Sequence, residues 1–214
     1  MVALEKAAVP ERAHETEALW ASTVLPAVRG SAARTVIFSL QRGDQNLKSF
    51  VALLRAVNVG GTGKLPMGEL KAMCEAAGFA EVRTFIASGN VVFKSAKSEP
   101  AIKAALEASL QRYAGKPVGV LVRSAEELAA VLKANPFPKA APDRTVAIFL
   151  DKPPGAKALA EITGQAGEEV RLGKREIYVH YGDGMGKSKL KIKAAADGTA
   201  RNMNTIAKLT ALLG

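Results

Sequence analysis

The sequence predicts an α+β protein built from two related ferredoxin-like (split βαβ) subdomains with mixed or antiparallel sheets. Three observations support this prediction. The central part of the chain alternates β-prone runs with helical apolar patterns in the order strand, helix, strand, strand, helix, strand. A Pro-rich stretch at 135–142 then stops the last helical pattern of this part, because proline disfavours a helical residue before it. The same order of elements starts again at residue 144.

Composition limits the class of protein. With 214 residues, of which 48% are hydrophobic, the chain can bury a substantial core in one domain or two small ones. No apolar run is long enough for a transmembrane helix, so no membrane partner is expected. Cys74 is the single cysteine, which excludes an internal disulfide and favours a reducing, cytoplasmic location. There is no Cys/His cluster, so a zinc site is not expected. We expect no other metal and no cofactor.

The formal net charge of +10 is unevenly placed. Residues 1–47 hold five basic and five acidic residues, whereas residues 184–214 hold six basic residues and a single acidic one, Asp197. A local excess of this kind attracts phosphate groups or nucleic acid. A solvated lysine face that keeps the protein soluble explains the same excess equally well.

Residues 1–47 are predicted to be a poorly ordered extension. The stretch is rich in alanine, and its one helical segment, 11–20, is too short to be stable alone. A short apolar run at 34–40 suits a sheet edge, and no signal-peptide core with a cleavage site is present. An overcalled gene start is one explanation of such an extension.

The first predicted subdomain, residues 48–134, begins with a strand that ends in a glycine loop. The run 50–57 is apolar except for Arg55, and it leads into Asn58 and a cluster that includes Gly60 and Gly61. This pattern is typical of a buried strand that delivers its end to an exposed backbone loop. Ligands often bind where such strands end.

Two helices and a hairpin follow this strand. Pro66 is expected to open the first helix, whose apolar face includes Cys74, so this thiol is expected to pack in the core and to be inert. The β-prone runs 81–87 and 90–94 predict a hairpin, in which Ser88 and Asn90 either shape the turn or face a ligand. The remaining predictions are a helix at 98–113, a strand at 117–122, and a third helix opened by a capping box at 124–127.

After the Pro-rich linker, 135–143, the second predicted subdomain covers residues 144–214 and includes the basic C-terminal segment. Its expected elements are a strand at 144–150, a short helix at 155–163, a hairpin of 168–172 with 175–181, and a final helix after residue 205. Gly173-Lys174 fits a two-residue hairpin turn. Within 187–193, Lys189, Lys191 and Lys193 alternate with Leu190 and Ile192, which suits a strand, although a helix starting at Ser188 is also possible.

A second glycine loop, 182–190, is the other candidate for chemistry. A strand leads into glycines and then Lys187-Ser188, which is how phosphate-cradling loops are built. The spacing fails the P-loop pattern because Tyr181 stands where the first glycine is required. Backbone N–H groups freed by Gly184 and Gly186 are nevertheless suited to one phosphate or carboxylate.

The candidate ligand-binding residues come from both glycine loops, the hairpin turn and the start of the last helix, and we expect Asn58, Asn90 and Ser188 to converge. They are Arg55, Asn58, Gly60, Gly61, Lys64, Ser88, Asn90, Gly184, Gly186, Lys187, Ser188, Lys189, Arg201, Asn202 and Asn204. Asn202 and Asn204 are alternatively caps of that helix. His180 is the weak candidate for a catalytic base, since the ordinary pKa of histidine lies near neutrality, but a hydrogen-bonded strand histidine is the plainer interpretation.

Five blocks in order resemble a known bacterial family. They are FVALLRAVNVGG (50–61), LPMGEL (65–70), FIASGNVVF (85–93), GMGKSKL (184–190) and TARNMNT (199–205). Together they resemble the family catalogued as domain of unknown function 1697, over residues 49 to about 212. The resemblance implies an α+β fold of two related subdomains and one site shared by these blocks, without naming a ligand or an activity. Family members often have an aromatic residue in the middle of the R-N-x-N block, where this chain has Met203.

Three functions remain open. The first is a binding protein for a phosphorylated small molecule, a nucleotide or nucleic acid, although an aromatic content of 5% leaves few residues for base stacking. The second is an enzyme on a small phosphorylated or carboxylated substrate, with Lys64, Lys187 and Arg201 on the anion. The third is a protein-interaction module in which the loops are merely tight turns. No pattern indicates the oligomeric state.

Overall fold

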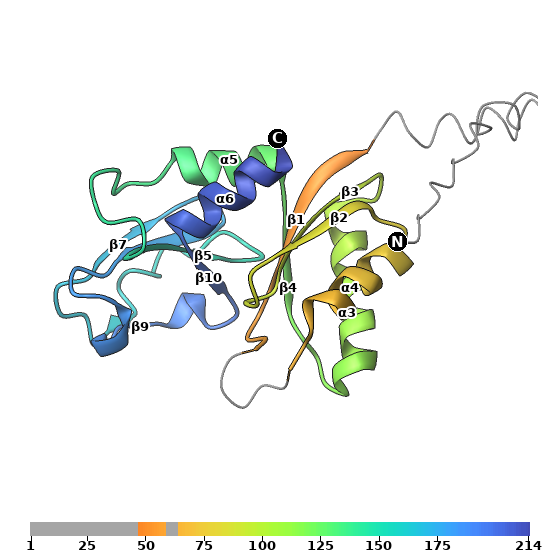
Figure 1. Ribbon diagram of the computed structural model, residues 1–214. Helices are drawn as coiled ribbons and strands as arrows, with labels where there is room; N and C mark the ends of the chain where they lie inside the picture. Colours follow the sequence, from red (N-terminus) through yellow and green to blue (C-terminus); the bar gives the residue numbers. More distant parts are fainter. Residues whose placement is uncertain (1–46, 59–63) are drawn as a thin grey trace, which may run out of the picture. The chain divides into compact units, whose positions relative to one another are not determined.

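The computed structural model describes residues 47–58 and 64–214 (Figure 1). Except for Leu47, the predicted extension lies outside the described residues, as do the candidates Gly60 and Gly61. The described residues form an α+β fold, as the sequence predicted, and their sheets are antiparallel, which is one of the two arrangements that the sequence left open.

The first sheet has four strands in the spatial order β2-β3-β1-β4. Its strands and connecting helices are β1 (Lys48–Leu54), α3 (Met67–Ala76), β2 (Ala80–Phe85), β3 (Asn90–Ser95), α4 (Glu99–Ala114) and β4 (Val120–Ser124). Every neighbouring pair is antiparallel, with β1 paired to both β3 and β4. All six elements occur in the predicted order and within a few residues of the predicted positions.

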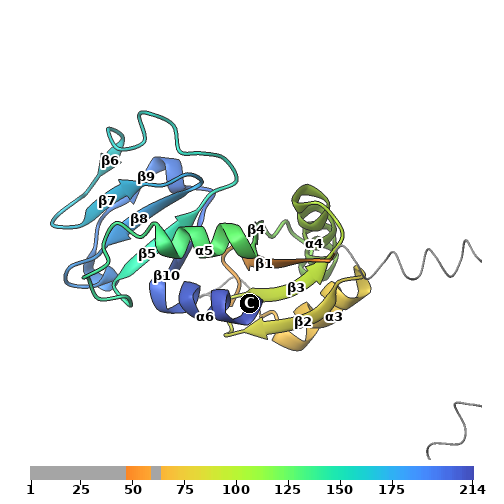
Figure 2. The same ribbon diagram turned by 90° about the horizontal axis from the view of Figure 1, so that it is seen from above.

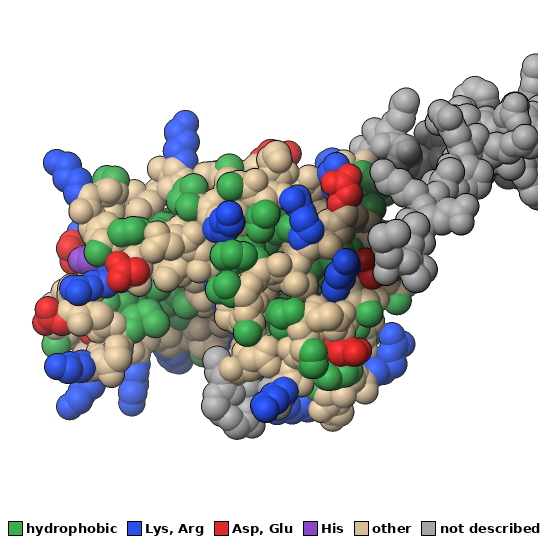
Figure 3. All heavy atoms as spheres, in the orientation of Figure 1, with side chains coloured by type: hydrophobic (Ala, Val, Ile, Leu, Met, Phe, Trp, Pro, Cys, Tyr) green, Lys and Arg blue, Asp and Glu red, His purple; other side chains and the backbone are tan. Residues whose placement is uncertain are grey.

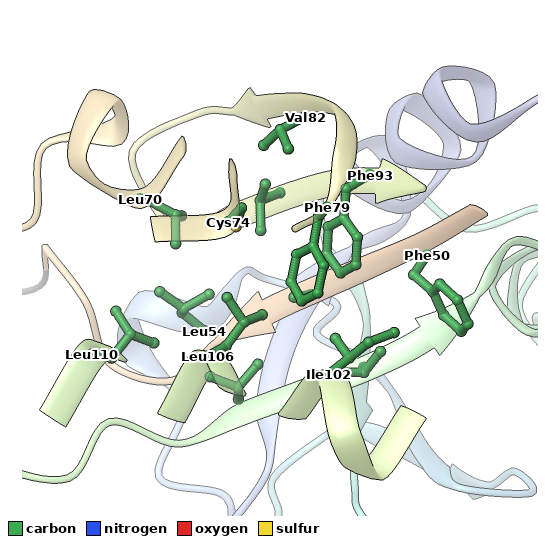
Figure 4. Packing of buried hydrophobic residues seen from close by; sticks show 14 of the residues in the cluster. Phe50, Leu54, Leu70, Cys74, Phe79, Val82, Phe93, Ile102, Leu106 and Leu110 are labelled. Atoms are coloured by element: carbon green, nitrogen blue, oxygen red, sulfur yellow. The ribbon is translucent and has the colours of Figure 1, made fainter. Parts of the chain in front are cut away.

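Helices α3 and α4 cover one face of this sheet (Figure 1). Phe79 and Phe93 stack in the core between these helices and the sheet, with ring centroids 4.4 Å apart (Figure 4). Cys74 is buried in the same cluster. Burial, with a smaller contribution from the charge of Glu75, raises the pKa of this thiol to about 12. Its buried position agrees with the core packing that the sequence predicted.

The opposite face of the first sheet packs against residues that follow this sheet in the chain. Helices α5 (Ala125–Lys133) and α6 (Met203–Leu213) lie side by side on this face (Figures 1 and 2). Val51 and Leu53 of β1 share a buried cluster with Phe149 and Tyr178 of the second sheet. Strand β1 is therefore buried on both faces, which explains its nearly continuous apolar sequence.

The second sheet has the spatial order β10-β5-β8-β7. Its strands are β5 (Thr145–Phe149), β7 (Glu169–Leu172), β8 (Glu176–His180) and β10 (Thr199–Asn202). The predicted strand and hairpin appear as β5, β7 and β8. The sequence does not predict strand β10; it places these four residues in the approach to the last helix.

A two-stranded ladder of β6 (Ile162–Thr163) and β9 (Lys191–Ile192) lies outside the second sheet. The helix predicted at 155–163 is wrong, since residues 156–161 form turns and the last two residues pair with β9. Leu159 is 46% exposed, so a helix there would bury little apolar surface. The ambiguous stretch 187–193 divides between the 3₁₀ turns η1 (Met185–Lys187) and η2 (Lys193–Ala195) and strand β9.

This ladder and its flanks cover the outer face of the second sheet (Figure 2). Ile177 and Val179 of β8 are buried there, and partly buried Tyr181, Leu190 and Ile192 pack against them. The loops that lead into and out of the ladder are thereby held against the end of a hydrophobic cluster.

The helices have local start signals. The predicted capping box of α5 is present, since Ser124 Oγ accepts from Glu127 N and the Glu127 carboxylate accepts from Ser124 N. Asn202 caps α6 by accepting a hydrogen bond from Thr205 N at 2.9 Å. No helix in the described ranges is long and apolar enough to cross a membrane.

Candidate functional site

A cleft of about 710 Å³ lies between two loops at one end of the β7–β8 hairpin. Its lining residues are Gly164, Gln165, Ala166, Gly167, Glu168, Tyr181, Gly182, Asp183, Gly184, Lys187, Ser188 and Lys189. The first loop, 164–168, enters β7, and the second, 181–189, leaves β8. Because Glu169 of β7 is paired with His180 of β8, antiparallel pairing brings the two loops to the same end of the hairpin.

The β6–β9 ladder ties the far ends of these loops together. Thr163 pairs with Lys191, and Gly164 then passes directly against Lys189. Gly164 has a φ of +68°, and an added Cβ would lie 2.2 Å from the Lys189 carbonyl oxygen. Only glycine combines this backbone conformation with so close an approach.

Glu168 joins the two loops inside the cleft. Its Oε1 accepts a hydrogen bond from Ser188 Oγ, and its Oε2 accepts one from Ala166 N at 2.6 Å. The hydrogen bond from Ser188, followed by those from backbone N–H groups, holds the pKa of Glu168 below its ordinary value of 4.5. Glu168 is therefore a carboxylate at neutral pH and a weak proton acceptor.

Three charged side chains of the lining are exposed and unengaged. Lys187, Lys189 and Asp183 form no ion pair with any residue that the structure describes. Glu168, by contrast, is 8% exposed and already bonded. The cleft thus offers two free cations and one free carboxylate to a ligand.

Tyr181 is the aromatic residue of the cleft lining. Its ring is half-buried because it packs against the outer hydrophobic cluster of the second sheet. Burial, followed by the charge of Glu168, raises the pKa of its phenol, so the hydroxyl is neutral near pH 7.

The structure divides the residues predicted for one site into two groups. Gly184, Lys187, Ser188 and Lys189 line the cleft, and Gly186 lies in the same loop. The residues predicted near the first glycine loop and the hairpin turn form a separate polar cluster at the end of β1. No hydrogen bond between described residues joins the two groups, and neither Asn58 nor Asn90 is hydrogen-bonded to Ser188.

Arg201 is the centre of this second group. Its guanidinium donates to Asn90 Oδ1, to Thr199 Oγ1 and to the carbonyl oxygens of Leu54 and Ser88. It is 8% exposed, and burial lowers its pKa to about 10. Each of its three nitrogens thus donates within the protein, so an anion at Arg201 would have to share or replace these hydrogen bonds.

The other members of this group also bond within the protein. Asn58 donates to Leu65 O at 2.9 Å and Ala87 O at 2.7 Å and accepts from Leu65 N at 2.8 Å, so its side chain is bonded to residue 65 and to the turn that follows β2. Arg55 pairs with Asp197 at 3.1 Å.

The remaining candidates lie elsewhere. Lys64 and Asn204 are exposed, and Asn202 is the cap of α6. His180, the weak catalytic candidate, is not part of the cleft lining. Its Nδ1 lies 3.2 Å from Thr145 Oγ1, and its ring packs against Phe137. It is a hydrogen-bonded strand histidine in this structure.

Sequence reasoning missed half of the cleft. The loop 164–168 is not among the site residues predicted from the sequence, although Gly164 and Gly167 lie within it and both adopt positive φ. The sequence signal for this loop is a glycine-rich segment that leads into the same hairpin from which the predicted loop 182–190 leads out. Among the described residues, no group of three or more His, Cys, Asp or Glu side chains is placed to hold a metal ion.

Comparison with known proteins gives a family and a fold. A family described as "Protein of unknown function (DUF1697)" matches this chain over residues 47–178. The conserved bacterial protein SP0830 from Streptococcus pneumoniae has a similar structure, with a TM-score of 0.66 and 23% sequence identity over 78% of this chain and 99% of that one. At that identity the likeness shows the fold alone. No curated protein matches this chain.

Proposed function

This chain belongs to the DUF1697 family, and from the geometry of its cleft we propose that it binds a small phosphorylated ligand between loops 164–168 and 181–189. The observation that carries the proposal is that Lys187, Ser188 and Lys189, expected from sequence at an anion site, line a cleft of about 710 Å³. Small-ligand sites typically enclose roughly 300–1,000 Å³.

The two lysines are available to a ligand. Neither forms an ion pair with the described residues, so no internal partner has to be displaced before Lys187 or Lys189 contacts a phosphate. An ammonium group is a common phosphate ligand, and charge-assisted hydrogen bonds are about twice as strong as neutral ones. The ligand would gain both contacts without breaking a folded-state interaction.

The state of Glu168 favours binding over catalysis by a serine nucleophile. Activation of Ser188 would need a base whose pKa lies near the working pH. Hydrogen bonds from Ser188 and Ala166 N instead lower the pKa of this carboxyl. The hydrogen bond from Ser188 to Glu168 therefore serves to hold the two loops together and to shape the cleft.

A small ligand fits better than a nucleic acid. On the face shown in Figure 3, Lys and Arg side chains are spread over the surface with Asp and Glu among them, and they do not form one basic band. Single-stranded nucleic acid binding normally combines a basic groove with several stacking aromatic residues. Tyr181 alone supplies such a ring in the cleft.

Two finer assignments belong to the same proposal. The strand order β2-β3-β1-β4 and the order of elements support a ferredoxin-like first subdomain at 48–134, joined by 135–143 to a second at 144–214. The lone buried thiol of Cys74 supports a reducing, cytoplasmic location.

The test compares two double variants in binding inorganic pyrophosphate by isothermal titration calorimetry. Lys187→Ala/Lys189→Ala removes the two free cations of the cleft, and Lys116→Ala/Lys139→Ala removes two exposed lysines outside it. We expect the cleft variant to lose at least about tenfold in affinity, since each contact to a charged group contributes about 1.5–3 kcal/mol, and the control to bind as wild type. Equal affinities in all three proteins, or no binding by wild type, would contradict the proposal.

A further inference from the structure

The cleft carries a free carboxylate beside its free lysines. Asp183 is exposed, lines the cleft and forms no ion pair with the described residues. A site for bare phosphate gains nothing from this group, because like charges repel. A ligand with an anionic end and a separate hydroxyl-bearing part accounts for both signs of charge, since a carboxylate accepts hydrogen bonds from hydroxyl groups.

Asp183, and not Glu168, is the acceptor available for such a part. Both oxygens of Glu168 already accept hydrogen bonds, from Ser188 and from Ala166 N. Asp183 accepts none from any described side chain or backbone group. The Glu168 carboxylate therefore fixes the shape of the cleft, and the Asp183 carboxylate is free to accept hydrogen bonds from a ligand.

Tyr181 adds an apolar ring surface to the same loop. Its ring is held half-buried against the hydrophobic cluster of the second sheet, so little side-chain freedom remains to be lost when a ligand packs on it. Planar bases stack on aromatic side chains with a gain of about 1–3 kcal/mol each. A ring, a carboxylate and an ammonium group follow one another along the loop 181–187.

We propose that the phosphorylated ligand of this cleft is a ribonucleoside phosphate, an inference that rests on the function proposed above. Its phosphate contacts Lys187 and Lys189, its ribose hydroxyls donate to Asp183, and its base packs against Tyr181. A carboxylate that accepts from a ribose 2′-hydroxyl is a general device for reading nucleotides. A cleft of about 710 Å³ has room for all three parts.

The test measures binding of AMP, 2′-deoxy-AMP and pyrophosphate to the full chain by isothermal titration calorimetry. In wild type we expect AMP to bind about tenfold more tightly than 2′-deoxy-AMP, which is the loss expected for one hydrogen bond to a charged group. In Asp183→Asn the ratio of these affinities falls towards one, while pyrophosphate affinity is unchanged or higher. Tyr181→Leu weakens both nucleotides and leaves pyrophosphate binding unchanged.

The outcomes separate this inference from the function on which it rests. Equal binding of AMP and 2′-deoxy-AMP by wild type, or a preference that persists in Asp183→Asn, overturns the inference. Pyrophosphate binding that depends on Lys187 and Lys189 would then still support the proposed function. No binding of pyrophosphate or AMP overturns both. Thermal melts of Asp183→Asn and Tyr181→Leu show that a changed affinity is not a loss of folded protein.

Discussion

Arg201 of strand β10 donates a buried hydrogen bond to Asn90 of strand β3, which joins the second sheet to the first. Arg201 is 8% exposed and Asn90 is fully buried. The same guanidinium donates at 3.0 Å to the carbonyl oxygens of Leu54 and Ser88. Its charge is thus held by backbone carbonyl groups, and no carboxylate in the described residues pairs with it.

An arginine of the first sheet likewise donates hydrogen bonds to backbone next to the second sheet. Arg123 of β4 is 1% exposed and donates to the carbonyl oxygens of Leu150 and Arg175, which flank strands of the second sheet. Burial, and then the charge of Arg175, lowers its pKa. Arg201 and Arg123 therefore both link the two sheets, because each donates hydrogen bonds to backbone carbonyl groups at the sheet to which it does not belong.

Arg201→Met is expected to lower the free energy of unfolding by about 3 kcal/mol or more, because it leaves the carbonyl groups of Leu54 and Ser88 and the amide of Asn90 buried with fewer partners. Urea denaturation followed by circular dichroism measures the change. Arg112→Met is the control, since Arg112 is exposed and donates to Ser109 within the same helix. A similarly small change in the free energy of unfolding in both variants would show that the hydrogen bonds from Arg201 to the first sheet contribute little to stability.

Local patterns predicted the first half well. The capping box at Ser124, the helical spacing around Cys74 and the apolar run of β1 each act within a few residues, and each was found where expected. The helix at 155–163 failed because Ile162 and Thr163 pair with β9, a contact with residues far along the chain. Tertiary pairing of this kind overrides local helix propensity.

The candidate site was also predicted only in part, because local patterns show one of its loops and tertiary pairing supplies the other. The exit loop with Lys187 and Ser188 was visible as a strand running into glycines. Glu168 was not, because its role depends on the β7–β8 hairpin bringing a second loop beside the first. The sequence predicts Arg201 at an anion site, since nothing local shows that strand pairing with β5 buries its side chain among carbonyl groups.

Gly164→Ala is expected to disturb the cleft. The substitution places a Cβ 2.2 Å from the Lys189 carbonyl oxygen at a backbone φ of +68°, so the two loops must separate. The left-handed conformation alone disfavours alanine by roughly 1–2 kcal/mol. We expect faster amide hydrogen exchange in β9 and weaker pyrophosphate binding. Gly155→Ala is the matched control, with nothing within 4 Å of its added Cβ, and exchange rates unchanged in both variants would contradict the contact.

Cys74 is expected to resist thiol reagents in the folded protein. The thiol is buried, and its pKa is raised to about 12, so almost no thiolate exists near neutral pH. Reaction with 5,5′-dithiobis(2-nitrobenzoic acid) at pH 8 should be slow in buffer and complete within minutes in guanidinium chloride. Rapid modification of the native protein would show that helix α3 opens readily.

The hydrogen bond between Ser188 and Glu168 makes stability depend on pH. The pKa of Glu168 is lower in the folded state than its ordinary value of 4.5, so the unfolded chain binds more protons in that range. The contribution of the carboxylate to stability is therefore complete above about pH 4.5 and is lost as pH falls through the folded-state pKa. Urea denaturation of wild type and Glu168→Gln between pH 3 and 7 isolates this contribution as the difference between the two curves.

We expect the difference in free energy of unfolding between wild type and Glu168→Gln to shrink as the pH falls below about 4.5. At neutral pH, Ser188→Ala is expected to remove most of the same stabilisation. In the double variant the two substitutions should be strongly non-additive, because each removes the same hydrogen bond. A separation between wild type and Glu168→Gln that stays constant from pH 7 to pH 3 would mean that the ionised carboxylate does not hold the loops together. The entrance and exit loops of the β7–β8 hairpin would then depend on the β6–β9 ladder and on Gly164 for their approach.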